Sequence, residues 1–159
     1  MRCGMGDIIK LSALALGEKI GRGEIKVAEV LDAVYKSEGE NRRLNCFITL
    51  CRERAYENGA EIQRRLDAGE YISPLAGVPI GIKDNIAVEG VKMTCGSRIL
   101  EDYVPPVSAT AVKKLEDAGL IVVGKLNMDE FAMGSTGETS YFGAVLNPLD
   151  ETRVPGGSS

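Results

Sequence analysis

Histidine is absent from the whole chain of 159 residues, and so is tryptophan. Without an imidazole, the Ser-His-Asp and Cys-His arrangements that activate the nucleophile in many hydrolases are excluded. Lysine, tyrosine, aspartate and glutamate remain as candidate general bases. Any acid–base chemistry by this chain must therefore use one of those four side chains.

The chain also has few cysteines, and their spacing is not that of a metal site. The four are Cys3, Cys46, Cys51 and Cys95, and no two of them form a C-x-x-C pair. Because there is no histidine, mixed zinc sites are excluded, and we expect no metal. We expect thiols that are not joined in disulfides and are mostly buried, as is usual in the cytoplasm.

Long apolar runs and a positive net charge are lacking as well. No stretch reaches the roughly 18 consecutive apolar residues of a membrane-spanning helix, and residues 1–10 lack the apolar core of a signal peptide. The net charge of -4 argues against a chain that binds nucleic acid by itself. The composition, 44% hydrophobic and 26% charged, is that of an ordinary globular protein. We therefore expect a protein of the cytoplasm.

Phosphate-binding loops are not indicated either. The segment GRGEIK (21–26) contains G-x-G, but Lys26 stands where a third glycine should be and no strand precedes it. We interpret it as a turn that separates two helices. No G-x-x-x-x-G-K-[ST] motif occurs, which excludes a Walker-type loop. The basic pair Arg42-Arg43 lies among glutamates and is interpreted as a solvated helix end.

Apolar residues follow helical spacing in several segments. Val27, Val30 and Leu31 begin an i, i+3, i+4, i+7 pattern that predicts an amphipathic helix. Asn127, followed three residues later by Glu130, has the capping-box pattern, so we expect another helix to start there. Further helices are expected at 11–20, 55–66 and 109–118, the last capped by Ser108, with Gly69 and Gly119 ending the last two.

Three short apolar segments, 46–50, 78–82 and 120–125, are candidate strands. A helix is followed by an apolar strand more than once, which predicts α/β layers with a largely buried sheet. We divide the chain into a helical region with a short strand at 1–70 and the start of the α/β core at 71–159.

Lys83 follows a run of branched aliphatic residues in the segment GVPIGIKDNI (77–86). An ordinary lysine has a pKa of about 10.4, so a lysine that acts as a base needs surroundings that disfavour its charge. Val78, Ile80 and Ile82 could provide them. The spacing alone leaves two interpretations open, a general base or a lysine that reaches the surface from a strand end.

The last six residues, VPGGSS (154–159), place two serines after two glycines. Such a loop lets the backbone approach a ligand closely and can direct hydroxyl or N–H groups at it. The same composition is typical of a flexible tail. Both interpretations remain open from the residues alone.

Four segments, in order, resemble consecutive motifs of the amidase signature family. The similarity runs from about Leu11 to the last residue, and it implies an α/β fold with α/β/α layers around a mixed sheet, of which this chain would be the N-terminal portion. The four segments are GVPIGIKDNI (77–86), TCGSRIL (94–100), GKLNMDEFAMGSTGETSYFGAVLNP (124–148) and VPGGSS (154–159).

The resemblance implies a Ser–cis-Ser–Lys catalytic triad. Lys83 would be the base, and Ser158 would be the bridging serine, preceded by a cis peptide bond. A neutral lysine could then relay a proton through one hydroxyl to a second serine that attacks an amide. The resemblance also assigns substrate binding to Met133, Gly134 and Ser135, and supporting positions to Asp84, Asn85, Gly156 and Gly157.

Within the family, the stretch NMDEFAMGS (127–135) is most similar to glutaminases that work inside three-subunit amidotransferases. This implies hydrolysis of glutamine and transfer of the ammonia to a partner, which converts Glu on tRNA(Gln) to Gln. The partners would be subunits B and C of a heterotrimer, and charged tRNA would be held by the partner. No cofactor is expected in this chain, and ATP and Mg²⁺ would be used at the partner subunit.

Family members continue their motif as GGSSGGS and carry the nucleophilic serine further along. No serine of this chain matches that nucleophile, so we expect an N-terminal fragment that is inactive alone and only marginally stable, because strand edges and apolar faces would be uncovered. Two alternatives remain open. One is a stand-alone amidase that acts on another small amide, and the other is a non-catalytic interaction fragment.

Overall fold

The computed structural model describes residues 5–159. Contacts within the chain divide it into two compact units. The first unit comprises the residues through Glu40 together with 52–80 and 113–123, and the second comprises 41–51, 81–112 and 124–159. The elements, in chain order, are α1 (Met5–Ile8), α2 (Ala13–Gly21), α3 (Val27–Glu40), η1 (Arg42–Leu44), β1 (Phe47–Leu50), α4 (Arg52–Asp67), β2 (Pro79–Lys83), η2 (Arg98–Leu100), α5 (Thr110–Asp117), β3 (Ile121–Leu126) and η3 (Glu130–Ala132).

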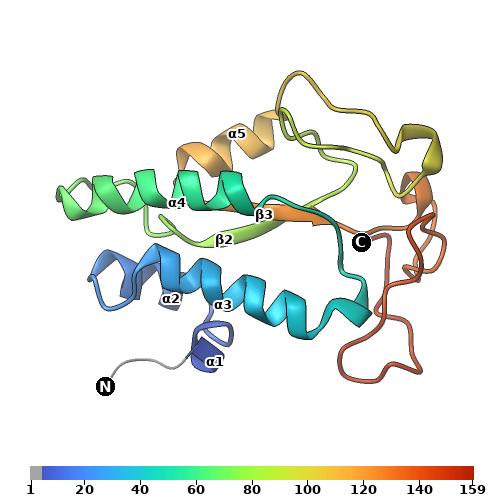
Figure 1. Cartoon of the computed structure of the whole chain (residues 1–159), viewed down its shortest axis with the longest axis horizontal. Coiled ribbons are helices and arrows are strands. Elements are labelled where there is room, and N and C mark those ends of the chain that lie inside the picture. Colours follow the sequence, from blue (N-terminus) through green and yellow to red (C-terminus); the bar gives the residue numbers. More distant parts are fainter. Residues whose placement is uncertain (1–4) are drawn as a thin grey trace. The chain divides into compact units, whose positions relative to one another are not determined.

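Helices α3 and α4 pack side by side in the first unit, where Figure 1 draws them in blue to cyan and in green. The apolar face predicted for α3 is confirmed, because Val27, Val30 and Leu31 are fully buried. Gly59 of α4 lies against this face, and a Cβ atom there would be only 3.0 Å from Cδ1 of Leu31. The absence of a side chain at Gly59 lets the two helices approach closely.

The other predicted helices form with small shifts at their ends. The helix expected at 11–20 starts at Ala13, because the side chain of Ser12 caps it by accepting a hydrogen bond from the Ala15 N–H. Gly69 and Gly119 have φ values of 80° and 81° and end α4 and α5 as predicted. Ser108 does not cap α5, because its hydroxyl accepts a hydrogen bond from the Glu89 N–H instead.

Three strands form one sheet in the order β1-β3-β2. Strand β1 runs antiparallel to β3, with Phe47 opposite Leu126 and Leu50 opposite Gly124. Strands β2 and β3 are joined through α5, the kind of crossover that parallel neighbours need. Each of these two strands passes from the first unit into the second. The predicted α/β class with a mixed sheet is confirmed.

The helix expected from Asn127 onward is wrong. The structure has only a short 3-10 turn there, and Phe131 and Ala132 adopt left-handed backbone conformations with φ values of 52° and 61°. Asn127 does not cap a helix, because its Nδ2 donates to the carbonyl oxygens of Asn45 and Gly143. Asn127 and Glu130 have the capping-box spacing, but the side chain of Asn127 forms long-range hydrogen bonds and does not cap a helix.

The second unit consists largely of loops around a small apolar core, which includes Ile82, Val88, Val112 and Met128. Its loops bring three predicted segments into one unit, namely the end of β2, the segment after β3 and the last residues of the chain. Across residues 5–159, no helix combines the length and the apolar character that crossing a lipid bilayer requires.

Candidate active site

Lys83 is the last residue of β2, and its side chain reaches the C-terminal segment of the chain. Nζ of Lys83 donates a hydrogen bond to Oγ of Ser158 at 2.5 Å, although 75 residues separate the two in sequence. Both residues are half-buried. The peptide bond between Gly157 and Ser158 is cis. The structure therefore brings together the two residues that the resemblance assigns to catalysis.

The environment of the Lys83 amine differs from the one expected. Successive side chains of a strand point to opposite faces, so Ile80 and Ile82 project away from the face that carries Lys83. Ile82 is buried on that other face. The aliphatic run therefore anchors the strand and does not itself surround the amine.

Asp84, the next residue, is completely buried and satisfied by hydrogen bonds. Its Oδ2 accepts from the N–H of Thr94 at 2.8 Å and from the Thr94 hydroxyl at 2.5 Å. Its Oδ1 lies 3.1 Å from Nζ of Lys125, which is also completely buried. Asn85 is exposed, and its side chain makes no hydrogen bond within residues 5–159. Of the two predicted supporting residues that follow Lys83, only Asp84 is held by hydrogen bonds of its side chain.

Lys125 is not among the site residues that the sequence motifs predict. It lies in β3, and its Nζ donates to Asp84 and, at 3.3 Å, to the carbonyl oxygen of Lys92. The available signal was the same one that drew attention to Lys83, a lysine at the end of an apolar strand. Applied to the segment LIVVGK (120–125), that signal would have identified Lys125 as a second buried amine.

Asp129 is also absent from the predicted site, because the capping-box pattern of its segment predicts a helix. The backbone N–H of Asp129 donates to the carbonyl oxygen of Ser158 at 2.8 Å. Its carboxylate is completely buried and accepts four hydrogen bonds from the loop 136–139. Burial acts to raise the pKa of Asp129, but the hydrogen bonds from Gly137, Thr139 and Thr136 outweigh it and hold that pKa below its usual value.

The predicted substrate-binding residues, Met133, Gly134 and Ser135, directly precede the loop 136–139 that bonds to the Asp129 carboxylate. All three are exposed, and the exposed fraction of Met133 is 82%. A Cβ atom on Gly157 would lie 2.5 Å from the carbonyl carbon of Ser135, so this loop touches the segment that carries Ser158. The structure therefore brings Ser135 next to the segment that carries Ser158.

Three cysteines fall within the described residues, and none is in a disulfide; Cys3 lies outside those residues. Cys51 is buried, whereas Cys46 is exposed and Cys95 is intermediate, so the expectation of mostly buried thiols holds for Cys51 alone. Burial and the negative charge of Asp84 raise the pKa of Cys95, although Lys125 partly opposes the shift. Between residues 5 and 159, no three His, Cys, Asp or Glu side chains gather as metal ligands would.

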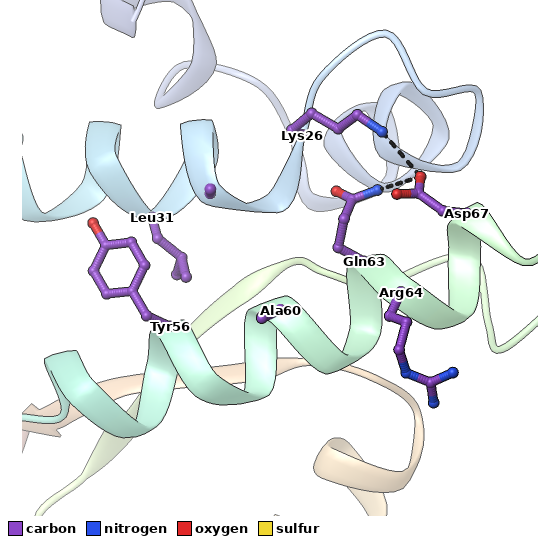
Figure 2. A pocket seen from close by; sticks show the side chains of 9 residues that line it. Lys26, Leu31, Tyr56, Ala60, Gln63, Arg64 and Asp67 are labelled. Atoms are coloured by element: carbon purple, nitrogen blue, oxygen red, sulfur yellow. Dashed lines mark hydrogen bonds and ion pairs between the residues drawn. The ribbon is translucent and has the colours of Figure 1, made fainter.

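A large hollow lies elsewhere, in the first unit between α3 and α4 (Figure 2), with a volume of about 600 Å³. Tyr56 and Leu31 are at one end of it, and at the other Lys26 and Gln63 both bond to Asp67. No residue singled out for catalysis lines this hollow. We therefore place the candidate active site at Lys83 and Ser158.

The pairing of a lysine amine with a serine hydroxyl in a glycine-rich segment is typical of a hydrolytic site of the Ser–Lys type. Such a site needs no histidine, and this α/β protein has none. The chain belongs to the amidase family, whose sequence model matches residues 29–159. That match covers most of the chain and includes both Lys83 and Ser158. The resemblance to the amidase signature family is thus confirmed.

Curated relatives are similar over nearly the whole chain. One from Agathobacter rectalis, named as the A subunit of glutamyl-tRNA(Gln) amidotransferase, is 50% identical over 154 residues, which are 96% of this chain and 31% of the relative. Another of the same name, from Deinococcus deserti, is 51% identical over 152 residues, covering 95% of this chain and 31% of the relative. The chain therefore spans about a third of the length of the curated relatives that it matches.

Solved structures of the family share the fold. One, described as a vestigial protein complex that reveals the evolutionary origins of an s-triazine catabolic enzyme, has a TM-score of 0.89 at 34% identity over 93% of this chain and 33% of its own. The peptide amidase of Stenotrophomonas maltophilia has a TM-score of 0.86 at 28% identity over 94% of this chain and 32% of its own. This chain corresponds to about a third of an amidase-type enzyme.

Proposed function

We propose that these residues are the N-terminal part of a glutaminase, the A subunit of a glutamyl-tRNA(Gln) amidotransferase. The observation that carries the proposal is the 2.5 Å hydrogen bond between Nζ of Lys83 and Oγ of Ser158. The choice of glutamine as substrate is supported by relatives of that name at 44–51% identity, against 28–34% for the solved amidases. The division at residue 70 into a helical region and a catalytic core belongs to the same proposal.

In the proposed mechanism the neutral amine of Lys83 takes the proton of the Ser158 hydroxyl. Ser158 in turn takes the proton of a second serine, outside these 159 residues, whose oxygen attacks the side-chain amide carbon of glutamine. The C–N bond breaks as the same relay returns a proton to the nitrogen, which leaves as ammonia. Water then attacks the acyl-enzyme. The Lys83–Ser158 pair accepts the proton of the water and returns it to the oxygen of the second serine as the ester bond breaks and glutamate leaves.

The partners belong to the same proposal. Ammonia would pass to subunits B and C, where Glu on tRNA(Gln) is amidated with ATP and Mg²⁺ bound at the partner. Because charged tRNA is used in translation, we place the complex in the cytoplasm. The 159 residues alone would be inactive, since the proposed nucleophile lies beyond them.

The test uses a full-length chimera, in which residues 1–159 replace the matching N-terminal segment of the Agathobacter rectalis relative. Release of glutamate and ammonia from glutamine is measured. Lys83→Ala and Ser158→Ala should each lower kcat by about 10²- to 10⁴-fold, the usual contribution of general base catalysis. Lys36→Ala, which removes an exposed lysine of α3, is the control and should keep full activity. Full activity in Lys83→Ala would refute the proposal.

A stand-alone amidase remains the second candidate, favoured by the TM-score of 0.86 to the peptide amidase. The two functions share the lysine–serine chemistry, so substitutions at Lys83 do not separate them. Addition of subunits B and C with charged tRNA should stimulate glutamine hydrolysis by a glutaminase subunit. Hydrolysis of varied amides with no effect of the partners would favour the stand-alone enzyme, and a complete absence of hydrolysis would favour an interaction module.

A further inference from the structure

Asp129 carries a buried negative charge that no cation within residues 5–159 neutralises. Its Oδ1 accepts from the N–H and the hydroxyl of Thr139 at 3.2 and 3.0 Å. Its Oδ2 accepts from the N–H groups of Thr136 and Gly137 at 3.2 and 3.0 Å. Burying a carboxylate is costly unless its oxygens are hydrogen-bonded, and here the donors all come from one short loop. The carboxylate therefore fixes the shape of the loop 136–139.

Two glycines leave room for this carboxylate. A Cβ atom on Gly134 would lie 2.4 Å from Cγ of Asp129, and one on Gly157 would lie 2.4 Å from its Oδ2. Real atoms do not approach so closely, so only glycine fits at either position. Gly134 lies two residues before the loop 136–139, and Gly157 directly precedes Ser158. The Asp129 side chain is thus packed between the loop and the serine segment.

The backbone of Asp129 completes the connection to the serine. Its N–H donates to the carbonyl oxygen of Ser158 at 2.8 Å, while the hydroxyl of Ser158 accepts from Lys83. Ser158 is therefore bonded on one side to the lysine and on the other to the residue that holds the loop. The hydroxyl of Thr139 adds a second link between the loop 136–139 and the backbone beside Asp129, because it also accepts a hydrogen bond from the N–H of Glu130.

We infer that Asp129 is a positioning residue for the Lys83–Ser158 pair: its buried carboxylate sets the loop 136–139 and its backbone sets Ser158, so that the Ser158 hydroxyl stays within hydrogen-bonding distance of the amine. This rests on the proposed function, since it gives Asp129 a role through the proposed catalytic pair. Misplacement of a reacting group by about 1 Å can cost on the order of 10²-fold in rate.

The test is a double-mutant cycle in the full-length chimera. Asp129→Asn is nearly isosteric but turns an N–H donor toward the N–H groups of the loop. It should lower kcat by about 10²-fold when Ser158 is present, and by less than about threefold in a Ser158→Ala background, because residues that act as a unit are not additive. Thr139→Val, which removes only the hydroxyl, should give a smaller loss with the same dependence on Ser158. Thr139→Val replaces Asp129→Asn in the cycle if the asparagine variant does not fold.

Asp150→Asn is the matched control. Asp150 also holds its own loop, through the N–H and hydroxyl of Thr152, but it is partly exposed and the structure gives it no bond to Ser158. This variant should keep full activity in both backgrounds. Equal fold losses for Asp129→Asn with and without Ser158, or no loss at all, would overturn the positioning role alone. Full activity in Ser158→Ala would overturn the proposed function and the inference together.

Discussion

Nζ of Lys125 lies 3.1 Å from Oδ1 of Asp84, and both side chains are completely excluded from solvent. Asp84 directly follows Lys83, so this ion pair anchors the end of the strand that carries the proposed base. Breaking a buried ion pair from one side leaves an uncompensated charge. We expect Lys125→Met to lower the free energy of unfolding by about 3–5 kcal/mol, measured by urea unfolding of the full-length chimera.

The control for Lys125→Met is Lys92→Met, which removes the lysine of an exposed pair with Asp102. An exposed pair contributes about 0–1 kcal/mol, so this variant should be close to neutral. The double variant Lys125→Met/Asp84→Asn should lose less stability than the sum of its two single variants, because neither charge is then left alone. Strict additivity of the two single losses would contradict the coupling.

Lys83→Arg separates the positive charge at this position from the ability to give up a proton. The guanidinium group can still donate to Ser158, but it stays protonated at any pH at which the protein is folded. We expect the glutaminase kcat of this variant to fall by about 10²- to 10⁴-fold, as for loss of a general base. Ammonia release at a mildly alkaline pH measures it, and turnover close to that of the unchanged protein would remove Lys83 from the mechanism.

Local pattern predicted most of the elements in this chain. The spacing of Val27, Val30 and Leu31 was sufficient to predict α3, because the residues that form the buried face of a helix are three or four positions apart in sequence. The same reasoning gave β1, β2 and β3 to within a residue or two at their ends. The helix predicted after β3 does not form, because the side chains of Asn127 and Asp129 bond to residues that are not their helical neighbours.

The candidate site was predictable only in part. Motif order singles out Lys83 and Ser158 as site residues, but only the folded chain puts their side chains in contact across 75 residues. Lys125 and Asp84, 41 residues apart, form their ion pair in the same way. The Lys125–Asp84 contact depends on how β3 lies beside β2, and the Lys83–Ser158 contact depends on the path of the loops that lead to Ser158. The spacing of apolar residues encodes neither.

The close approach at Gly157 gives a third prediction. In Gly157→Ala the new Cβ would meet Oδ2 of Asp129 at 2.4 Å and the backbone nitrogen of Thr136 at 2.6 Å. Backbone atoms cannot move aside as a flexible side chain can. We expect Ser158 to be displaced and kcat to fall by about 10²-fold, with glutamate release as the measurement.

Gly39→Ala is the matched control for that substitution. Gly39 lies in α3, and apart from its chain neighbours and the backbone of its own helix, no atom is within 4 Å of the position that its Cβ would take. Alanine should therefore leave activity unchanged and raise the free energy of unfolding by about 0.5–1 kcal/mol, because it is a better helix former. Full activity in Gly157→Ala would show that the backbone around Gly157 can shift without displacing Ser158 from its catalytic position.

The ionised state of Asp129 predicts how stability changes with acid. Burial opposes ionisation, but the hydrogen bonds from Gly137, Thr139 and Thr136 outweigh it, so the pKa of this carboxyl is lower in the folded protein than in the unfolded chain. The folded state therefore holds the proton more weakly. The contribution of the Asp129 carboxylate to stability is fully present above the unfolded pKa of about 4 and is lost as the pH falls through the folded pKa.

Urea unfolding of the full-length chimera and of its Asp129→Asn variant, from about pH 7 down to about pH 3, measures this contribution. The unchanged protein should be the more stable at neutral pH, because its ionised carboxylate matches the four donors of the loop. The difference should shrink as the pH falls, since protonation removes the advantage of aspartate over asparagine. A difference that stays constant over this range would mean that the loop does not depend on the charge of Asp129.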